Sequence, residues 1–343
     1  MKEYLIELKP RSSFEIQLHA DTIFGAICWG IRTLFGETTL HKELLSQFND
    51  SPESPPFLIS SAFPCRPDRG EYYFPKPLLK PLTSEQLYTL AQKYSTYDRP
   101  YHSSKKTLMD IGVKYKEFRK IRWIQYYNIL KKQTKMISEF SLFIDYLDNI
   151  AAEPRYSVTE AIQKNSLDRL SNSTGGSGNT FYNEESACKE TWSLYFLIKT
   201  DNLSKFILNS LKFLEDSGIG RNSKTGKNWF FINVKESPFS ATNDGTHFIT
   251  LSRYIKNESL QLDKSFYSLI PVRSKVESRE EFAGENVWKN RVMYFQAGSV
   301  LYPETKKDCY GALIPVKDIK KKIIYQYGYA YPFWINAEVN NEI

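Results

Sequence analysis

The hydrophobic positions of the chain alternate and repeat in a pattern that opens each half of the sequence. Residues 2–8 place apolar side chains at every second position, as a half-buried strand does. A helix is expected next, with Asp21 as its N-cap and Gly36 as its stop. Its apolar residues recur every three or four positions: Ile23, Ile27, Ile31 and Leu34.

The second half repeats this order of elements. Residues 192–198 alternate as a strand, and a helix capped by Asn202 and ended by Gly218 follows. A further strand is expected at residues 229–234. Two such openings in tandem predict an α+β fold of two antiparallel sheets, each with helices on one face, and we expect two tandem ferredoxin-like (RRM-like) domains. That topology is compatible with RNA binding but does not establish it.

The composition is that of a globular chain whose basic excess is local. The 343 residues are 41% hydrophobic and 25% charged, with a net charge of +7. Residues 105–135 hold ten basic side chains and two acidic ones, so this segment accounts for the whole excess. A polyanionic partner is one explanation of such a patch, and a solvated face or docking on an acidic protein is another.

Cysteines, histidines and apolar runs exclude several classes of protein. The four cysteines form no CxxC pair and the four histidines no HxxxH or HExxH pair, so we expect no disulfide framework, metal site or cofactor. No run of 18 apolar residues occurs and the N-terminus does not resemble a signal peptide. These features predict a cytoplasmic protein without a membrane partner.

The most informative local motif is a glycine-rich loop at residues 217–228, S-G-I-G-R-N-S-K-T-G-K-N. Glycines allow close backbone approach, so amide groups could hold phosphates while Arg221, Lys224 and Lys227 add positive charge. The loop is not a Walker A motif, because it lacks GxxxxGK[ST] and joins a helix to a strand rather than a strand to a helix. A flexible basic turn is the structural alternative.

Ten short motifs, in one order along the chain, resemble the RAMP superfamily of CRISPR-associated proteins, and within it the subunit-4 family of the type III-A Csm effector complex. They are L-H-A-D-T-I-F-G-A-I-C-W (18–29), P-P-F-L-I-S-S-A-F-P (55–64), Y-F-P-K-P-L (73–78), R-Y-S-V (155–158), N-S-L-D-R-L (165–170), F-Y-N-E-E (181–185), G-I-G-R (218–221), T-L-S-R-Y (250–254), A-G-S-V (297–300) and Y-G-Y-A-Y-P-F (327–333).

The resemblance implies a non-catalytic subunit that holds the 5′ handle of the crRNA. Such a subunit caps the filament of repeated backbone subunits and docks the large polymerase-cyclase subunit, and it meets target RNA only indirectly. It also implies a thumb hairpin at residues 155–185. The N-terminal domain would span residues 1–190, with the thumb and a basic insertion at 105–135. The C-terminal domain would span residues 191–343, with the glycine-rich loop.

The candidate RNA-binding residues combine groups that fix phosphates with an aromatic wedge, Phe181, that separates bases. The full set is His19, Arg155, Asn165, Arg169, Phe181, Gly218, Gly220, Arg221, Asn222, Ser223, Lys224, Thr225, Lys227, Arg253, Arg273 and Lys275.

Three alternatives to this interpretation follow from the residues. His19 and His102 are candidate acid–base groups of a repeat-RNA processing endoribonuclease, whereas Asp21 is more simply an N-cap. A counterpart from the related Cmr complex and a pure protein adaptor are the others. Two aromatic sets, one within 105–135 and one of alternating tyrosines, fit either base stacking or core packing, the tyrosines being Tyr325, Tyr327, Tyr329 and Tyr331.

Overall fold

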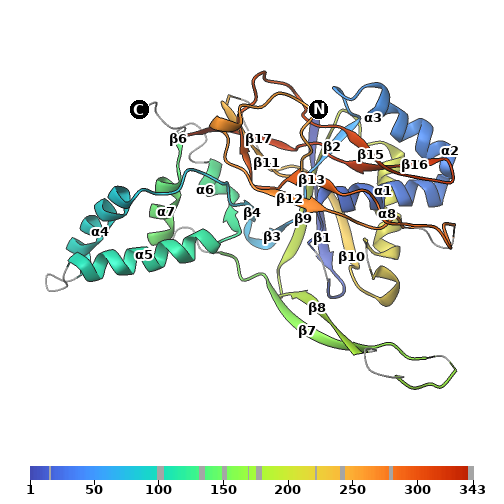
Figure 1. The fold of residues 1–343 in the computed structure, drawn as a ribbon, viewed down its shortest axis with the longest axis horizontal. Helices are drawn as coiled ribbons and strands as arrows, with labels where there is room; N and C mark the ends of the chain where they lie inside the picture. The colour runs from blue at the N-terminus through green and yellow to red at the C-terminus, as the bar shows by residue number, and fades with distance from the viewer. Residues whose placement is uncertain are drawn as a thin grey trace. The chain divides into compact units, whose positions relative to one another are not determined.

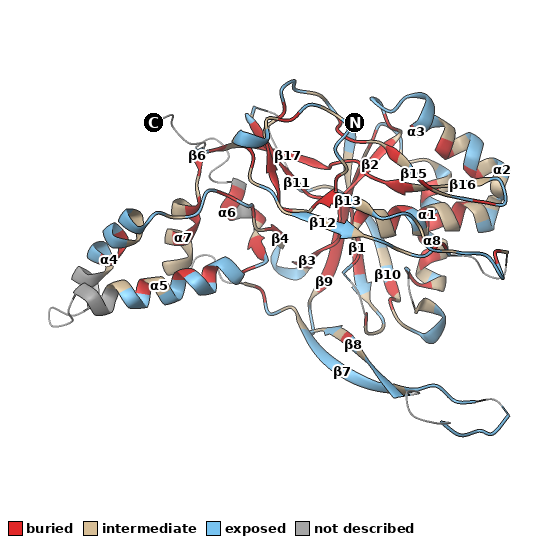
Figure 2. Cartoon of the chain, in the orientation of Figure 1, coloured by how far each residue is buried: buried red, intermediate tan, exposed pale blue. Residues whose placement is uncertain are grey.

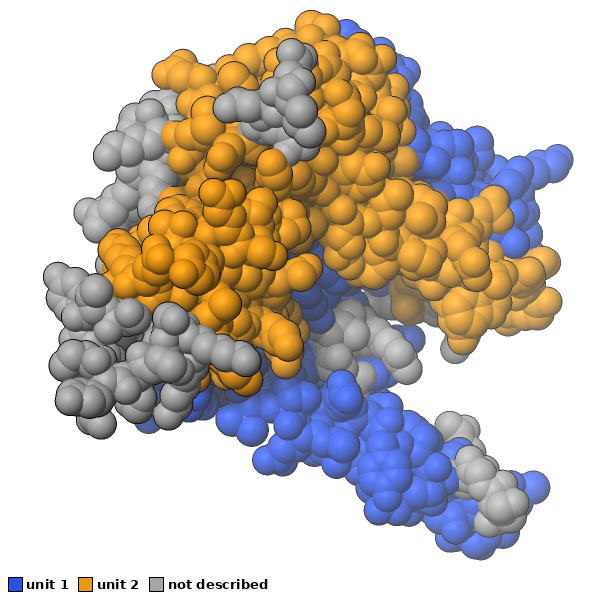
Figure 3. Space-filling view, turned by 60° about the vertical axis from the view of Figure 1, so that its left-hand side comes forward, with its two compact units in different colours: residues 1–70, 155–238, 312–329 blue, residues 71–154, 239–311, 330–343 orange. Residues whose placement is uncertain are grey.

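The computed structural model describes residues 1–14, 17–98, 104–130, 136–148, 153–168, 170–174, 180–220, 222–239, 244–277 and 281–338 (Figure 1). The chain forms two compact units, coloured separately in Figure 3. Both draw on segments from either side of residue 190. Unit 1 comprises Met1–Gly70, Arg155–Pro238 and Ala312–Tyr329, and unit 2 comprises Glu71–Pro154, Phe239–Gly311 and Ala330–Ile343.

Unit 1 is built on an antiparallel sheet in which the strands run in the order β10-β1-β9-β3. Helix α1 follows β1, and helix α8 connects β9 to β10. Both helices were expected from the sequence, as were β1, β9 and β10. These elements are β1 (Lys2–Pro10), α1 (Ala20–Phe35), β2 (Phe57–Ile59), β3 (Phe63–Arg66), β9 (Ser193–Thr200), α8 (Lys205–Ser217) and β10 (Phe230–Glu236).

The core of unit 1 lies on both sides of this sheet. Four consecutive residues of β1, Leu5 to Leu8, are buried, and so are residues 193–198 of β9 (Figure 2). An RRM domain binds RNA on an open sheet face, so these strands offer no such face. Further elements complete the unit: α2 (Glu37–Leu40), a π-helical turn (His41–Leu45), α3 (Ser46–Asp50), 3₁₀ turns (Pro67–Arg69 and Ser223–Thr225), β15 (Leu313–Ile319) and β16 (Lys322–Tyr327).

Three of the four alternating tyrosines pack in the core, as one of the two interpretations expected, whereas Tyr325 is half-buried. Tyr327, Tyr329 and Tyr331 are buried. In unit 1 the Tyr327 ring lies 5.0 Å from that of Phe24, and its hydroxyl receives the Ile59 amide at 2.9 Å. These rings therefore stabilise the fold and are not a stacking platform.

Two helix starts differ from the expected caps. His19, in extended conformation, is the N-cap of α1, and Asp21 lies in the first turn, where its carboxylate accepts a hydrogen bond from Gln326 at 2.9 Å. Helix α8 begins after Ser204, whose hydroxyl accepts the Ile207 amide, instead of after Asn202. In both cases the extended residue that immediately precedes the first helical turn takes the cap position.

Unit 1 also carries a hairpin of β7 (Ser157–Asn165) and β8 (Thr180–Cys188), in the place expected of the thumb. Its strands pair antiparallel from Ser157 with Cys188 to Asn165 with Thr180. Nearly the whole hairpin is exposed on both faces (Figure 2). A two-stranded ribbon without a covered face is only marginally stable by itself, so its position depends on contacts at its base.

Unit 2 combines a four-stranded sheet, of order β14-β11-β17-β6, with two antiparallel strand pairs, β4 with β5 and β12 with β13. Its elements are β4 (Glu71–Pro75), α4 (Ser84–Asp98), α5 (Ser104–Lys120), β5 (Trp123–Gln125), α6 (Tyr126–Leu130), β6 (Met136–Ile137), α7 (Glu139–Leu147), β11 (His247–Thr250), a 3₁₀ turn (Leu262–Lys264), β12 (Leu269–Val272), β13 (Val292–Phe295), β14 (Val300–Leu301) and β17 (Pro332–Ala337). The two units together confirm the α+β class.

The described part of the basic segment, residues 105–130, lies on α5, β5 and α6, and its described aromatic rings are buried. Three of the segment's basic residues lie outside the described residues: Lys131, Lys132 and Lys135. Tyr115 and Phe118 pack on Phe143 of α7, with ring centroids 5.2 and 5.3 Å apart. The basic side chains on α5 from Lys114 onward are exposed. The rings therefore form the helical core rather than a base-stacking surface. No described helix has the length and apolar character needed to cross a membrane.

Candidate nucleic-acid interface

The glycine-rich loop leaves α8 at Gly218 and returns to the sheet at Phe230. Five of its residues have positive φ, which explains its richness in glycine and asparagine: Gly218, Gly220, Asn222, Gly226 and Asn228. A Cβ at Gly218 would lie 2.7 Å from the Cβ of Ser223 and 2.9 Å from the Trp229 ring. The first glycine therefore serves close packing within the loop.

Much of the loop backbone is already hydrogen-bonded. The Ile219 amide donates to the Asn228 carbonyl at 2.9 Å, and the Asn228 amide donates to Ser13 at 3.0 Å. The amides of Gly218, Thr225, Gly226 and Lys227 also donate to carbonyl oxygens of the chain. These six amide groups are committed to the fold and are not available to a ligand. Lys224 and Thr225 are exposed.

The loop is joined to the base of the hairpin through Glu185 of β8. Lys227 forms an ion pair with the Glu185 carboxylate, and Lys164 of β7 lies 2.8 Å from its other oxygen. Ser13 donates to Glu185 at 2.9 Å and accepts from Lys227 at 2.9 Å. The two elements that the sequence assigned to RNA binding therefore meet at one buried carboxylate. We call these four residues the Glu185 cluster.

Electrostatics within the Glu185 cluster favour the ionised carboxylate. The Glu185 side chain is 3% exposed. Hydrogen bonds from Lys164 and then Lys227, aided by Ser13, lower its pKa to about 2. Because Lys227 is paired in this way, part of the charge assigned to RNA instead holds the loop against the hairpin. Glu185 appeared in the sequence only within a family motif, and nothing local indicated its partners.

The segment before α1 completes the connection. Phe14 pairs with Ser186 of β8 through both backbone hydrogen bonds, while the Trp229 amide donates to the Ser12 hydroxyl at 3.1 Å. The Arg11 guanidinium lies 4.7 Å from the centre of the exposed Phe231 ring. Arg11 therefore places an exposed cation and an aromatic ring beside the loop. Sequence patterns did not identify it.

The hairpin presents an apolar stripe on one face. In the β7–β8 register, Phe181 pairs with Lys164, and Val158 and Ile162 lie on the same face because they are two-residue multiples away. All three apolar side chains are exposed. Charged side chains interrupt this stripe, since Glu160 lies between Val158 and Ile162 and Lys164 lies opposite Phe181. Exposed apolar side chains that lie close together are characteristic of a surface that a partner covers. The predicted wedge, Phe181, belongs to this stripe.

The remaining candidates fall into both units. Arg155 and Asn165 are exposed in unit 1, at the base and the outer end of β7, and His19 is half-buried at the start of α1. Arg253, half-buried, and the exposed Arg273 and Lys275 belong to unit 2. The roles of all these residues stay predictions. Three others lie outside the described residues: His102, Arg169 and Arg221.

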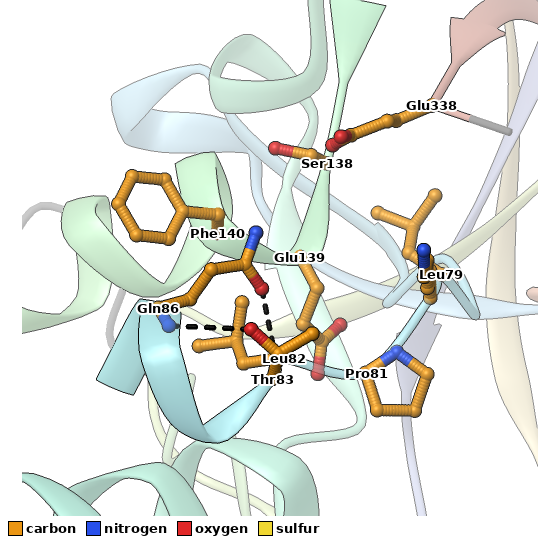
Figure 4. A pocket seen from close by; sticks show the side chains of 10 residues that line it. Leu79, Pro81, Leu82, Thr83, Gln86, Ser138, Glu139, Phe140 and Glu338 are labelled. Atoms are coloured by element: carbon orange, nitrogen blue, oxygen red, sulfur yellow. Dashed lines mark hydrogen bonds between the residues drawn. The ribbon is translucent and has the colours of Figure 1, made fainter. Parts of the chain in front are cut away.

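A catalytic site requires metal ligands or titratable side chains that lie close together in space. Residues that the structure describes contain no group of three or more potential metal ligands among His, Cys, Asp and Glu. A cavity in unit 2, shown in Figure 4, lies between the starts of α4 and α7. Its carboxylate Glu139 lies 3.7 Å from the Lys76 ammonium, and Thr83 and Gln86 cap α4 through reciprocal hydrogen bonds. These lining groups hold the helices in place.

The chain is similar in sequence to one curated protein and in fold to several solved structures. No family model matches it. The CRISPR system Cms protein Csm4 of Thermococcus onnurineus (strain NA1) is 25% identical over 256 residues, which cover 74% of this chain and 75% of that protein.

The solved structures extend the likeness over the whole chain. A chain of the Csm1–Csm4 cassette in complex with cA4 matches with a TM-score of 0.59 and 19% identity, covering 100% of both chains. A chain of the Csm3–Csm4 subcomplex of the type III-A CRISPR-Cas interference complex matches with a TM-score of 0.58 and 18% identity, covering 98% of this chain and 100% of that one. Sequence and fold together confirm the resemblance that the motifs indicated: this chain is similar to Csm4.

Proposed function

We propose that this protein is the Csm4 subunit of a type III-A CRISPR interference complex and that it holds the 5′ handle of the crRNA without catalysing a reaction. The observation that carries the proposal is the junction of the glycine-rich loop with the hairpin at the Glu185 cluster. RNA-binding surfaces combine fixed cations with exposed rings. Here Lys224, Arg11 and Phe231 supply such groups beside the thumb.

The topology of unit 1 supports the fold expected of such a subunit. Four strands of unit 1 occur along the chain in the order β1, β3, β9, β10. In the sheet they lie side by side in the order β10-β1-β9-β3, so the fourth strand lies beside the first and the third beside the second. Helices α1 and α8 follow the first and third strands. This β-α-β-β-α-β arrangement is that of a ferredoxin-like domain, and the hairpin is an insertion between β3 and β9. We assign the second ferredoxin-like domain to unit 2.

The partners follow from the solved relatives and from the exposed hairpin. The related structures hold Csm4 together with Csm1 and with Csm3. We assign the same partners to this chain, Csm1 as the large polymerase-cyclase subunit and Csm3 as the repeated backbone subunit. The stripe of Val158, Ile162 and Phe181 suits a thumb that contacts a neighbouring subunit and separates bases. Target RNA would then meet this chain only indirectly.

The test compares two lysines of unit 1 in the assembled complex. Lys224→Ala removes the exposed cation of the loop, and Lys212→Ala removes an exposed cation of α8 that pairs with Glu215. We expect Lys224→Ala to release crRNA at lower salt and to reduce the salt slope of handle binding by about 0.7 if one phosphate contact is lost. Lys212→Ala should match the wild type.

Hairpin residues provide a second arm of the same test. Phe181→Ala should weaken handle binding or subunit assembly without changing the stability of unit 1, since its ring is exposed. Unchanged crRNA content and assembly in Lys224→Ala and Phe181→Ala would refute the proposal. Specific cleavage of repeat RNA by the isolated chain, lost in His19→Ala, would instead establish the endoribonuclease alternative.

A further inference from the structure

The segment that joins β12 to β13 in unit 2 carries a tryptophan beside two cations, Arg273 and Lys275, which the sequence had already suggested as RNA-binding residues. Trp288 is 43% exposed. The Lys275 ammonium lies 4.7 Å from the centre of its ring, and the Arg273 guanidinium carbon lies 5.4 Å from it. An indole this exposed is unusual, because large aromatic rings are normally buried. A ligand that covered the ring would remove its apolar surface from water.

The backbone fixes this arrangement. Trp288 forms a β-bridge with Lys275, and hydrogen bonds flank the bridge on both sides, from Val276 to Val287 at 2.8 Å and from Lys289 to Ser274 at 2.9 Å. Arg273 is further held by a hydrogen bond from its Nε to the Lys289 carbonyl at 3.3 Å. The ring and the cations are therefore positioned before any ligand arrives, which reduces the entropy lost on binding.

Further exposed side chains near this segment include one cation and one apolar residue. Arg291 is exposed on the strand that leads into β13, and Met293 is exposed beside Pro271, its partner in the register. The described residues between Lys275 and Trp288 also include acidic side chains, Glu277, Glu281 and Glu285. The surface thus offers a stacking ring, phosphate-binding groups and an apolar flank.

We propose that Trp288 of unit 2, with Arg273 and Lys275, is a stacking site for one base of single-stranded RNA. Proteins bind single strands by stacking bases on exposed aromatic rings while neighbouring cations contact the backbone. The inference rests on the proposed function only in taking RNA as the ligand. It assigns a contact residue, Trp288, that sequence patterns did not indicate, and gives Arg273 and Lys275 one shared role.

The test uses the purified full chain and a fluorescein-labelled single-stranded oligoadenylate, with binding followed by anisotropy at several salt concentrations. Trp288→Ala should weaken binding about 5- to 150-fold, which is the range for one stacked base. Trp288→Phe keeps a stacking ring and should recover most of the affinity. The double variant R273Q/K275Q should lower the salt slope by about 0.7 for each lost contact.

The matched control is Trp29→Ala. Trp29 lies 5.4 Å from the Arg32 guanidinium on α1, so this variant also breaks a tryptophan–arginine pair but one with a single described cation over its ring. It should leave RNA affinity unchanged. Unfolding by urea is measured for all variants, and binding is compared under conditions in which each variant remains folded. The charge variant, which alters exposed side chains alone, keeps the test decisive if Trp288→Ala does not fold.

Three outcomes overturn the inference. One is wild-type affinity in both Trp288 variants with an unchanged salt slope in R273Q/K275Q. Another is a loss of stability in Trp288→Ala without a loss of affinity, which makes the cluster purely structural. The third is that the Trp288 and R273Q/K275Q variants bind RNA with wild-type affinity but no longer bind Csm1 or Csm3, which makes the cluster a protein contact. If Lys224→Ala still releases crRNA in any of these cases, the proposed function stands; if neither site affects RNA, both fail.

Discussion

Replacing Glu185 by glutamine tests whether one buried carboxylate joins the thumb to the glycine-rich loop. The substitution keeps the shape of the side chain and removes its charge. Lys164 and Lys227 then lose their anionic partner, and Ser13 keeps only a neutral acceptor. We expect a less stable chain in which the base of the hairpin opens more readily.

The magnitude follows from the pKa of the carboxyl group. A fall from 4.5 to about 2 corresponds to about 3 kcal/mol at pH 7. The Lys164 and Lys227 side chains are 26% and 23% exposed, so solvent screens part of this and we expect about 2 kcal/mol. Since folding lowers this pKa, the contribution is present above about pH 5 and is lost as the pH falls toward 2.

The assay is urea unfolding of the full chain at pH 7 and at steps down to pH 3, with Glu184→Gln as the matched control. Glu184 precedes Glu185 on β8 and is exposed. Glu185→Gln should unfold at lower urea than the control at pH 7, and the gap should narrow on acidification. Equal midpoints at pH 7, or a gap independent of pH, would contradict the assigned role of the cluster.

Two further predictions concern packing and a second buried charge. Gly30→Ala should lower the free energy of unfolding by about 1–3 kcal/mol, because the new Cβ would lie 2.9 Å from the Cβ of Ser210. Gly25→Ala in the same helix meets no atom within 4 Å and should raise the free energy of unfolding by about 1 kcal/mol. Thermal unfolding of the two variants measures this difference. Glu139→Ala should cost about 3–5 kcal/mol in urea unfolding, since it leaves the Lys76 ammonium buried without its carboxylate; a loss below 1 kcal/mol would refute that assignment.

Local signals in the sequence were sufficient for the elements of unit 1. Alternation predicted β1, and glycines with left-handed or otherwise restricted backbone marked the ends of α1 and α8, at Gly36 and Gly218. Each of these signals acts within one or two turns of the chain. The hairpin position came instead from the family resemblance, because its exposed strands lack the alternation that a half-buried sheet imposes.

Contacts between residues that lie far apart in the sequence could not be predicted in the same way. The Glu185 cluster joins side chains that lie more than 170 residues apart in the sequence at its extremes, and no pattern at Ser13 indicates a carboxylate partner. The turn between β15 and β16 is another case. Lys320 and Lys321 both adopt positive φ there, although such turns favour Asn-Gly, so the sequence alone does not mark it.

The glycine-rich loop shows why residue types predict a backbone conformation but not the partners of its amide groups. Glycine makes positive φ accessible, yet the direction of each N–H depends on which carbonyl the folded chain brings near. Here the Ile219 and Asn228 amides point into the protein, and Lys227 is held by Glu185. Under the proposed function, exposed cations such as Lys224 and the amides outside this set are the groups left to contact RNA. Side-chain ion pairs with phosphate are salt-dependent, whereas an amide cradle is much less so, and the salt slope therefore distinguishes the two chemistries at this loop.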